Sequence, residues 1–234
     1  SQIKKTQKKV VFADGEDQNT LKAAIAFKKS GLGIPILIAK EKVVKERLKE
    51  IGYSENFDIE IVNSTSKEKK EKYLKYIFKK LHKDKGELEP DVYELYLKDC
   101  ERLIKNDRVV WGSCMVSCGD ADAMVTGNTR RYSSSLEKII KVVDPRQGEI
   151  MFGLNLIVNR GKTIFLCDTS VIEYPDATQL ADMAVSAARV VRLFGFDPKV
   201  AFLSHSTFGE PATDRTKRIS DAVKILKERN VNFK

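Results

Sequence analysis

The chain has few of the residues that build metal centres and disulfide frameworks. Its 234 residues include two histidines and four cysteines, which are Cys100, Cys114, Cys118 and Cys167. Four irregularly spaced cysteines are too few for the disulfide framework of a secreted domain, so the sequence favours a reducing compartment. Two histidines leave little room for metal chemistry, and we predict no metal site in this chain.

Long apolar runs are also missing. No stretch approaches the roughly eighteen apolar residues that a membrane span needs, and the start, Ser-Gln-Ile-Lys-Lys, lacks the apolar centre of a signal peptide. We therefore predict a cytoplasmic protein with no membrane partner. The hydrophobic share of 42% is enough to bury a core, which excludes intrinsic disorder.

Positive charge is in excess, with Lys+Arg 42 against Asp+Glu 33 and a net charge of +9. Such a balance suits nucleic acid, a membrane surface, a nucleotide or an acidic metabolite. Nine lysines fall in residues 66–86, where an apolar stripe at helical spacing predicts an amphipathic helix. We interpret its lysines as a solvated face, because aromatic side chains that stack on bases should lie among the charges. We predict no specific nucleic-acid partner, and a basic nucleic-acid-binding protein stays an alternative.

Apolar strands alternate with helices along the whole chain. The predicted strands cover residues 9–13, 34–39, 59–63, 122–125, 163–167 and 199–204. The predicted helices cover residues 19–29, 42–51, 66–86, 91–104, 109–117, 133–143, 178–194 and 213–230. This alternation predicts an α/β fold with mostly parallel sheets and helices on both faces. We place a first domain at 1–145 and a second at 146–234, and we expect the second to be truncated because residues 231–234 begin like another strand.

Ligands of open α/β sheets bind beyond the carboxyl ends of the strands, so the loops at those ends are informative. Residues 14–17, Asp-Gly-Glu-Asp, place three carboxylates before a helix, where they suit capping but would repel phosphate. The loops at 126–133 and 204–209 instead combine glycine, hydroxyls and arginine, which suit phosphate or carboxylate. Their candidate ligand residues are Thr126, Gly127, Thr129, Arg130, Arg131, Ser133, Ser204, Ser206, Thr207 and Gly209.

Each of these candidates has a plainer alternative. Arg130 and Arg131 would be solvated or ion-paired, and the hydroxyls of the 204–209 loop would cap their own turn. A serine hydrolase built on His205 is not favoured, since the nucleophile-elbow pattern is absent and adjacent residues of an extended chain point to opposite faces. Cys114 and Cys118 are four residues apart, which can suit a metal, but we interpret them as buried thiols. We expect the single Trp111 in the core or at a subunit interface.

Four segments together resemble one family. They are Val10-Val-Phe-Ala-Asp-Gly-Glu-Asp17, Gly119-Asp-Ala-Asp-Ala-Met-Val-Thr-Gly127, Pro175-Asp-Ala-Thr-Gln-Leu-Ala-Asp182 and Pro198-Lys-Val-Ala-Phe-Leu-Ser-His-Ser-Thr207. In order and spacing they are similar to phosphate acetyltransferases, which transfer an acetyl group between coenzyme A and phosphate. The resemblance implies two three-layer α/β/α domains with the ligand cleft between them, an isocitrate dehydrogenase-like architecture.

The sequence departs from the transferase pattern at several positions. The family has arginines roughly where Glu137 and His82 stand here, and Lys-Gly-Ser where this chain has Phe-Gly-Glu-Pro at 208–211. The family's catalytic aspartate lies beyond the point where this sequence ends, so we assign no catalytic residue. The segments at 131–132, 144–148 and 204–209 look more like the carboxyl-terminal domain of bacterial hybrid NADP-dependent malic enzymes.

That resemblance implies a regulatory and oligomerisation domain that binds acetyl-CoA or a related acyl-CoA and has no cofactor of its own. NADP and Mg²⁺ or Mn²⁺ would serve the amino-terminal malic enzyme half, which would be a partner domain in the same chain of a homo-oligomer. That half oxidises and decarboxylates malate to pyruvate. The alternative is a working phosphate acetyltransferase. On the malic enzyme interpretation, we expect the two loops to hold the phosphates or pantetheine of acetyl-CoA from opposite sides of the cleft.

Overall fold

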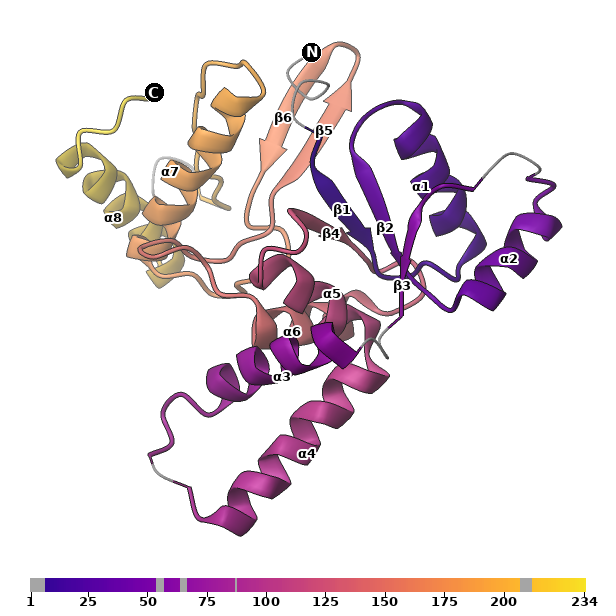
Figure 1. Ribbon diagram of the computed structural model, residues 1–234. Helices are drawn as coiled ribbons and strands as arrows, with labels where there is room; N and C mark the ends of the chain where they lie inside the picture. Colours follow the sequence, from indigo (N-terminus) through magenta and orange to yellow (C-terminus); the bar gives the residue numbers. More distant parts are fainter. Residues whose placement is uncertain (1–6, 54–56, 64–66, 87, 207–211) are drawn as a thin grey trace. The chain divides into compact units, whose positions relative to one another are not determined.

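A computed structural model describes residues 7–53, 57–63, 67–86, 88–206 and 212–234 (Figure 1). The chain divides into two compact units, Ser1–Asp144 and Pro145–Lys234. Both units combine strands with helices, which confirms the predicted α/β class.

The first unit is built on a four-stranded sheet. Its strands are β1 (Lys9–Phe12), β2 (Ile34–Ile38), β3 (Glu60–Val62) and β4 (Ala123–Val125). They lie in the order β3-β2-β1-β4, and every neighbouring pair is parallel, as predicted. The strand predicted at 122–125 is formed as β4. Its run of apolar residues favours a buried strand, but β4 is mostly exposed because, among the described strands, it pairs with β1 alone at the edge of the sheet.

Helices cover both faces of this sheet, because alternate strand residues point to opposite sides. Val11 packs on one face and the adjacent Phe12 on the other. The helices on the Val11 face are α3 (Lys67–Leu81), α4 (Pro90–Asn106), α5 (Arg108–Ser117) and α6 (Tyr132–Val142). Those on the Phe12 face are α1 (Gln18–Lys29) and α2 (Glu41–Glu50). The first unit therefore has the three layers that were expected.

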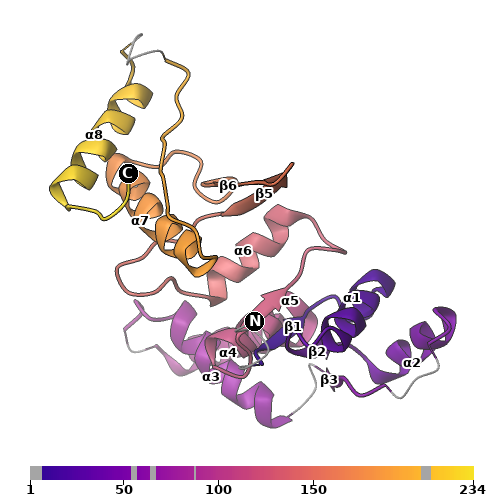
Figure 2. The same ribbon diagram turned by 90° about the horizontal axis from the view of Figure 1, so that it is seen from above.

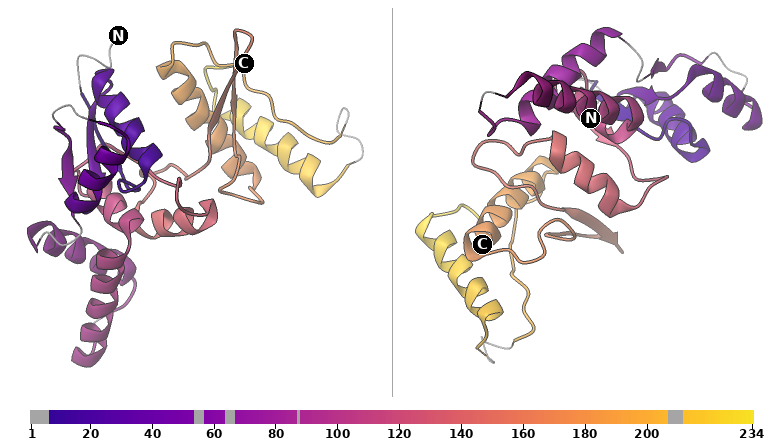
Figure 3. Two further views of the ribbon diagram at one scale, coloured as in Figure 1. Left: turned by 90° about the vertical axis from the view of Figure 1, so that its right-hand side faces the viewer. Right: turned by 90° about the horizontal axis from the view of Figure 1, so that it is seen from below.

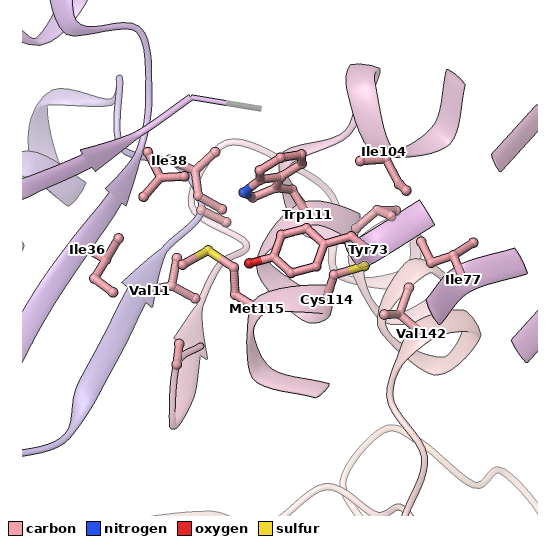
Figure 4. Packing of buried hydrophobic residues seen from close by; sticks show 14 of the residues in the cluster. Val11, Ile36, Ile38, Tyr73, Ile77, Ile104, Trp111, Cys114, Met115 and Val142 are labelled. Atoms are coloured by element: carbon pink, nitrogen blue, oxygen red, sulfur yellow. The ribbon is translucent and has the colours of Figure 1, made fainter. Parts of the chain in front are cut away.

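Trp111 lies at the centre of the larger hydrophobic cluster (Figure 4). The side chain is fully buried, and its ring meets that of Tyr73 edge-on with centroids 4.9 Å apart. Cys114, one turn along α5, is buried in the same cluster. Of the two expectations for Trp111, the structure therefore supports the core.

The lysine-rich segment forms α3, which lies beside α4 (Figure 3). Tyr73 and Ile77 of its apolar stripe are buried against the sheet. Several of its lysines pair with acidic residues: Lys69 with Glu60, Lys70 with Glu101, Lys72 with Asp120 and Lys80 with Asp144. Part of the positive charge of this helix is therefore balanced within the unit.

The second unit contains an antiparallel hairpin. Strands β5 (Asn155–Asn159) and β6 (Lys162–Leu166) pair through a turn at Arg160 and Gly161, whose φ angles are 48° and 76°. Positive φ at both positions matches the two-residue turn that suits strand twist. The prediction of a strand near 163–167 is confirmed, but β5 was missed, and the expectation of parallel pairing is wrong here because the neighbour is the adjacent segment.

Two long helices complete this unit, α7 (Ala177–Leu193) and α8 (Asp214–Glu228), which pack on each other (Figure 2). The predicted strand at 199–204 is not formed, because within the described residues this segment has one backbone bond, from Val200 N to Lys234 O at 2.7 Å, and no ladder. Residues 231–234 likewise form no strand. Among the described helices, none has the length and apolarity to cross a membrane.

Candidate functional site

The 126–133 loop runs from edge strand β4 into the first turn of α6, and it is held by a carboxylate from a distant part of the chain. Asp14 lies just beyond β1 and is only 4% exposed. One of its oxygens accepts hydrogen bonds from the backbone N–H groups of Gly127 (3.1 Å) and Asn128 (3.2 Å). The other accepts the hydroxyl of Thr129 at 2.5 Å. Asp14 therefore already occupies three donors of the predicted ligand loop.

The side chain of Asn128 adds a second attachment, to the start of α1. Its Nδ2 donates to Asp17 Oδ1 at 2.5 Å and to Thr20 Oγ1 at 3.2 Å. Asp17 is the N-cap of α1 and accepts the backbone N–H of Thr20, which holds the pKa of Asp17 below its usual value. Glu16 accepts the backbone N–H of Lys40 instead. Of the three carboxylates that were predicted to cap this helix, Asp17 does so. The prediction is wrong for Asp14 and Glu16, whose carboxylates bind other segments.

A second carboxylate, the partly buried Asp107, holds the basic part of the loop. Asp107 caps α5 by accepting the backbone N–H groups of Val109 and Val110 at 2.9 and 3.3 Å. It also accepts a hydrogen bond from Arg130 at 2.8 Å and pairs with Lys138 of α6. Burial alone would raise the pKa of Asp107, but the bonds from Lys138 and Arg130 hold it below the usual value. For Arg130, the paired alternative is the one observed.

Three donors of the 126–133 loop are not used by these carboxylates, two of them at the start of α6. Arg131 is exposed and, within the described part of the chain, its guanidinium makes no hydrogen bond or ion pair. Ser133 is exposed in the first helical turn, which contains no acidic residue. The hydroxyl of Thr126 is buried and has no partner among the described residues. First-turn N–H groups need acceptors, so this end of α6 suits an anion.

Only the beginning of the 204–209 loop is described. The hydroxyls of Ser204 and Ser206 are 3.0 Å apart, and the N–H of Ser206 donates to Ser204 Oγ at 3.2 Å. Both serines line a shallow hollow with Lys224 and Lys227 of α8. In the part of this loop that is described, no hydrogen bond joins His205 to either serine.

The remaining loop candidates, Thr207 and Gly209, lie outside the described residues, as does most of the Phe-Gly-Glu-Pro departure at 208–211. The hydrogen bonds between Ser204 and Ser206 match the turn-capping alternative. The hydroxyls of both serines also line the hollow that contains Lys224 and Lys227.

Metal ligands do not assemble: across the described ranges, no group of three or more His, Cys, Asp or Glu side chains is placed to hold an ion. Burial raises the pKa of Cys114, which therefore stays a neutral thiol, and burial also raises that of the partly exposed Cys118. Two neutral thiols inside a hydrophobic cluster are packing residues.

The two positions where the family has arginines carry other interactions here. Glu137 is exposed on α6 and pairs with Lys141 at 2.6 Å. His82 Nδ1 lies 3.0 Å from the carbonyl oxygen of Phe78, and the His82 ring stacks on Tyr96 with centroids 4.4 Å apart. Position 137 therefore carries a carboxylate, and position 82 carries a ring that packs against the rings of Phe78 and Tyr96.

Comparison with known proteins gives a consistent relationship. A model of the phosphate acetyl/butaryl transferase family matches residues 1–234. The NADP-dependent malic enzyme of Rhizobium meliloti is 36% identical over 232 residues, which are 99% of this chain and 29% of that protein. A phosphate acetyltransferase of Acetivibrio thermocellus is 28% identical over 95% of this chain and 65% of its own length. A solved phosphotransacetylase from Streptococcus pyogenes superposes with a TM-score of 0.81 at 24% identity, covering 97% of this chain and 66% of that one.

Proposed function

Because this chain belongs to the phosphate acetyl/butaryl transferase family, we propose that it is the phosphotransacetylase-like domain of a malic enzyme and binds acetyl-CoA or a related acyl-CoA as an effector. The observation that carries the proposal is the 36% identity to NADP-dependent malic enzymes over nearly the whole chain. The chain spans less than a third of those relatives. In this proposal, malate oxidation with NADP and Mg²⁺ or Mn²⁺ belongs to an amino-terminal partner domain of a homo-oligomer.

The start of α6 is the part of the first unit that we assign to the ligand. Arg131 supplies a guanidinium that no carboxylate neutralises in the described structure, and a guanidinium binds phosphate through parallel N–H donors. Ser133 adds a hydroxyl, and the first-turn amides add donors and a positive helix end. Gly127, Thr129 and Arg130 keep the loop in shape through Asp14 and Asp107. The buried hydroxyl of Thr126 has no partner among the described residues and is assigned to the ligand as an unused donor.

The second unit contributes a separate set of donors in this proposal. Ser204 and Ser206 carry hydroxyls beside the cations of Lys224 and Lys227, a combination that suits a phosphate or a pantetheine amide. Thr207 and Gly209 continue the same loop and are assigned to the same ligand on the resemblance alone.

Calorimetric titration of the full-length protein with acetyl-CoA tests the assignment. We expect saturable binding that weakens about tenfold or more in Arg131→Ala, since a charge-assisted hydrogen bond contributes about 1.5–3 kcal/mol. Arg47→Ala is the matched control, because Arg47 is exposed on α2 and pairs only with Glu50 among the described residues. Absence of binding to the wild type would refute the effector role, and equal affinities of Arg131→Ala and the wild type would refute the site.

A working phosphate acetyltransferase is the second candidate, favoured by the similarity to the enzyme from Acetivibrio thermocellus. In that case the full-length protein forms acetyl phosphate from acetyl-CoA and phosphate. Against it stand the carboxylate of Glu137 and the stacked ring of His82, where the transferase pattern has cations. Acetyl phosphate production above the level of an Arg131→Ala control would favour this candidate.

A further inference from the structure

The 126–133 loop contains a small anion-binding cradle whose anion comes from the chain itself. Two successive backbone N–H groups and a hydroxyl converge on one carboxylate, that of Asp14. Gly127 adopts φ of 101°, which turns the backbone in a way that favours glycine. Convergent backbone amides of this kind commonly hold a phosphate or a carboxylate ligand. Here the pocket is filled by residue 14, more than one hundred positions earlier in the sequence.

We propose that Asp14 is a built-in anion, a positioning residue that fixes the 126–133 loop and excludes external anions from its amides. Each amide has a single proton to donate, so the amides that bind Asp14 are not available to a ligand. The loop then presents only Arg131 and the start of α6 to a bound anion. This last step rests on the proposed function, whereas the positioning role of Asp14 does not.

Three observations support the positioning role. Asp14 is 4% exposed, so its carboxylate depends on donors from the chain itself. A buried carboxylate requires donors, and the described structure supplies three from this one loop. Asp107 fixes the next residue, Arg130, from another element. The loop is thus anchored at consecutive residues, and Arg131 follows directly.

The first test needs no acyl-CoA. Asp14→Ala removes a carboxylate of the size of formate and leaves its donors in place. We expect hydrogen exchange at the amides of Gly127 and Asn128 to accelerate about tenfold or more, and formate to reverse this saturably while chloride at equal ionic strength does not. Asp14→Asn keeps one acceptor oxygen, so it should lose less protection and gain nothing from formate. Asp122→Ala is the control, since Asp122 accepts a backbone N–H from Lys9 outside the loop.

Formate without effect on folded Asp14→Ala would overturn the proposal. If Asp14→Ala does not fold, as judged by the fluorescence of Trp111, folding in formate but not in chloride supports the proposal and failure in both overturns it. Acetyl-CoA affinity should also fall in Asp14→Ala and recover with formate. If the variant binds acetyl-CoA more tightly than the wild type, the amides freed by the substitution serve the ligand, and the step in which Asp14 positions Arg131 for the ligand is wrong. If the wild type binds no acetyl-CoA, the proposed function fails while the exchange and rescue results still decide the role of Asp14.

Discussion

Asp107→Ala should destabilise the first unit by about 2–3 kcal/mol. Asp107 is the N-cap of α5, and loss of such a cap costs about 1 kcal/mol. It also pairs with Arg130 and Lys138, whose side chains are 30% and 27% exposed. Because water can replace the carboxylate at such exposure, each lost pair adds only about 0.5–1 kcal/mol.

The assay can be confined to the first unit, because the only tryptophan, Trp111, is buried on the helix that Asp107 caps. In urea titrations followed by Trp111 fluorescence, Asp107→Ala should lower the midpoint and leave the slope unchanged. Asp107→Asn keeps an acceptor for the cap and should lose about 1–2 kcal/mol. Asp221→Ala is the control, since Asp221 forms an ion pair with Lys224 in the second unit and should leave this transition in place.

The effect should also depend on pH in a defined direction. Because the folded pKa of Asp107 is held below the unfolded value of about 4, the stabilisation is present above that value and is lost as pH falls through the folded pKa. The difference between wild type and Asp107→Ala should therefore be constant near neutral pH and shrink below about pH 4. A midpoint shift no larger than that of Asp221→Ala, or a difference that grows on acidification, would refute this reasoning.

Two further predictions concern other parts of the fold. Asp168 accepts backbone N–H bonds from Gly153 and from three residues that follow it, and these bonds outweigh burial and lower its pKa. Asp168→Ala should cost about 2 kcal/mol, measured as faster hydrogen exchange at Gly153, and the difference from the wild type should shrink as pH falls below about 4. In Gly33→Ala the new methyl carbon would lie 2.6 Å from the carbonyl oxygen of Lys8, so the free energy of unfolding measured by thermal denaturation should fall by about 1–3 kcal/mol. Gly86→Ala is the control, because Gly86 has open space around it and this change should leave the stability unaltered.

The parallel sheet of the first unit was predictable because its signal is local. Each strand is a short, largely apolar run, and each following helix has its own apolar stripe. The role of Asp14 was not predictable in the same way. Its sequence neighbours, Gly15 to Asp17, look like a helix start, and only the pairing of β1 with β4 brings Asp14 to Gly127. A carboxylate directly after a buried strand was the available signal, and it fitted capping equally well.

In the second unit, the local sequence pattern did not predict all of the strands correctly. Residues 199–204 have the composition of a strand, but a strand requires a neighbour, and the local pattern does not reveal whether one is present. Only β6 of the hairpin was predicted, because β5 has just three apolar residues between Asn155 and Asn159 at its ends. Its turn at Arg160 and Gly161 was the stronger signal, since a glycine there permits the tight reversal.

The order of strands in the first sheet has a consequence for how the 126–133 loop forms. The pairs of β1 with β2 join residues close in sequence, whereas β4 joins β1 at Val10 and Ala123. Loop closure over such a distance is slow, so β4 should add late to a sheet that already contains β1 and β2. During synthesis, Asp14 emerges long before the amides that it binds. The 126–133 loop should therefore take its shape after β1 and β2 have paired, and a chain in which β4 has not yet paired lacks the contacts between Asp14 and this loop.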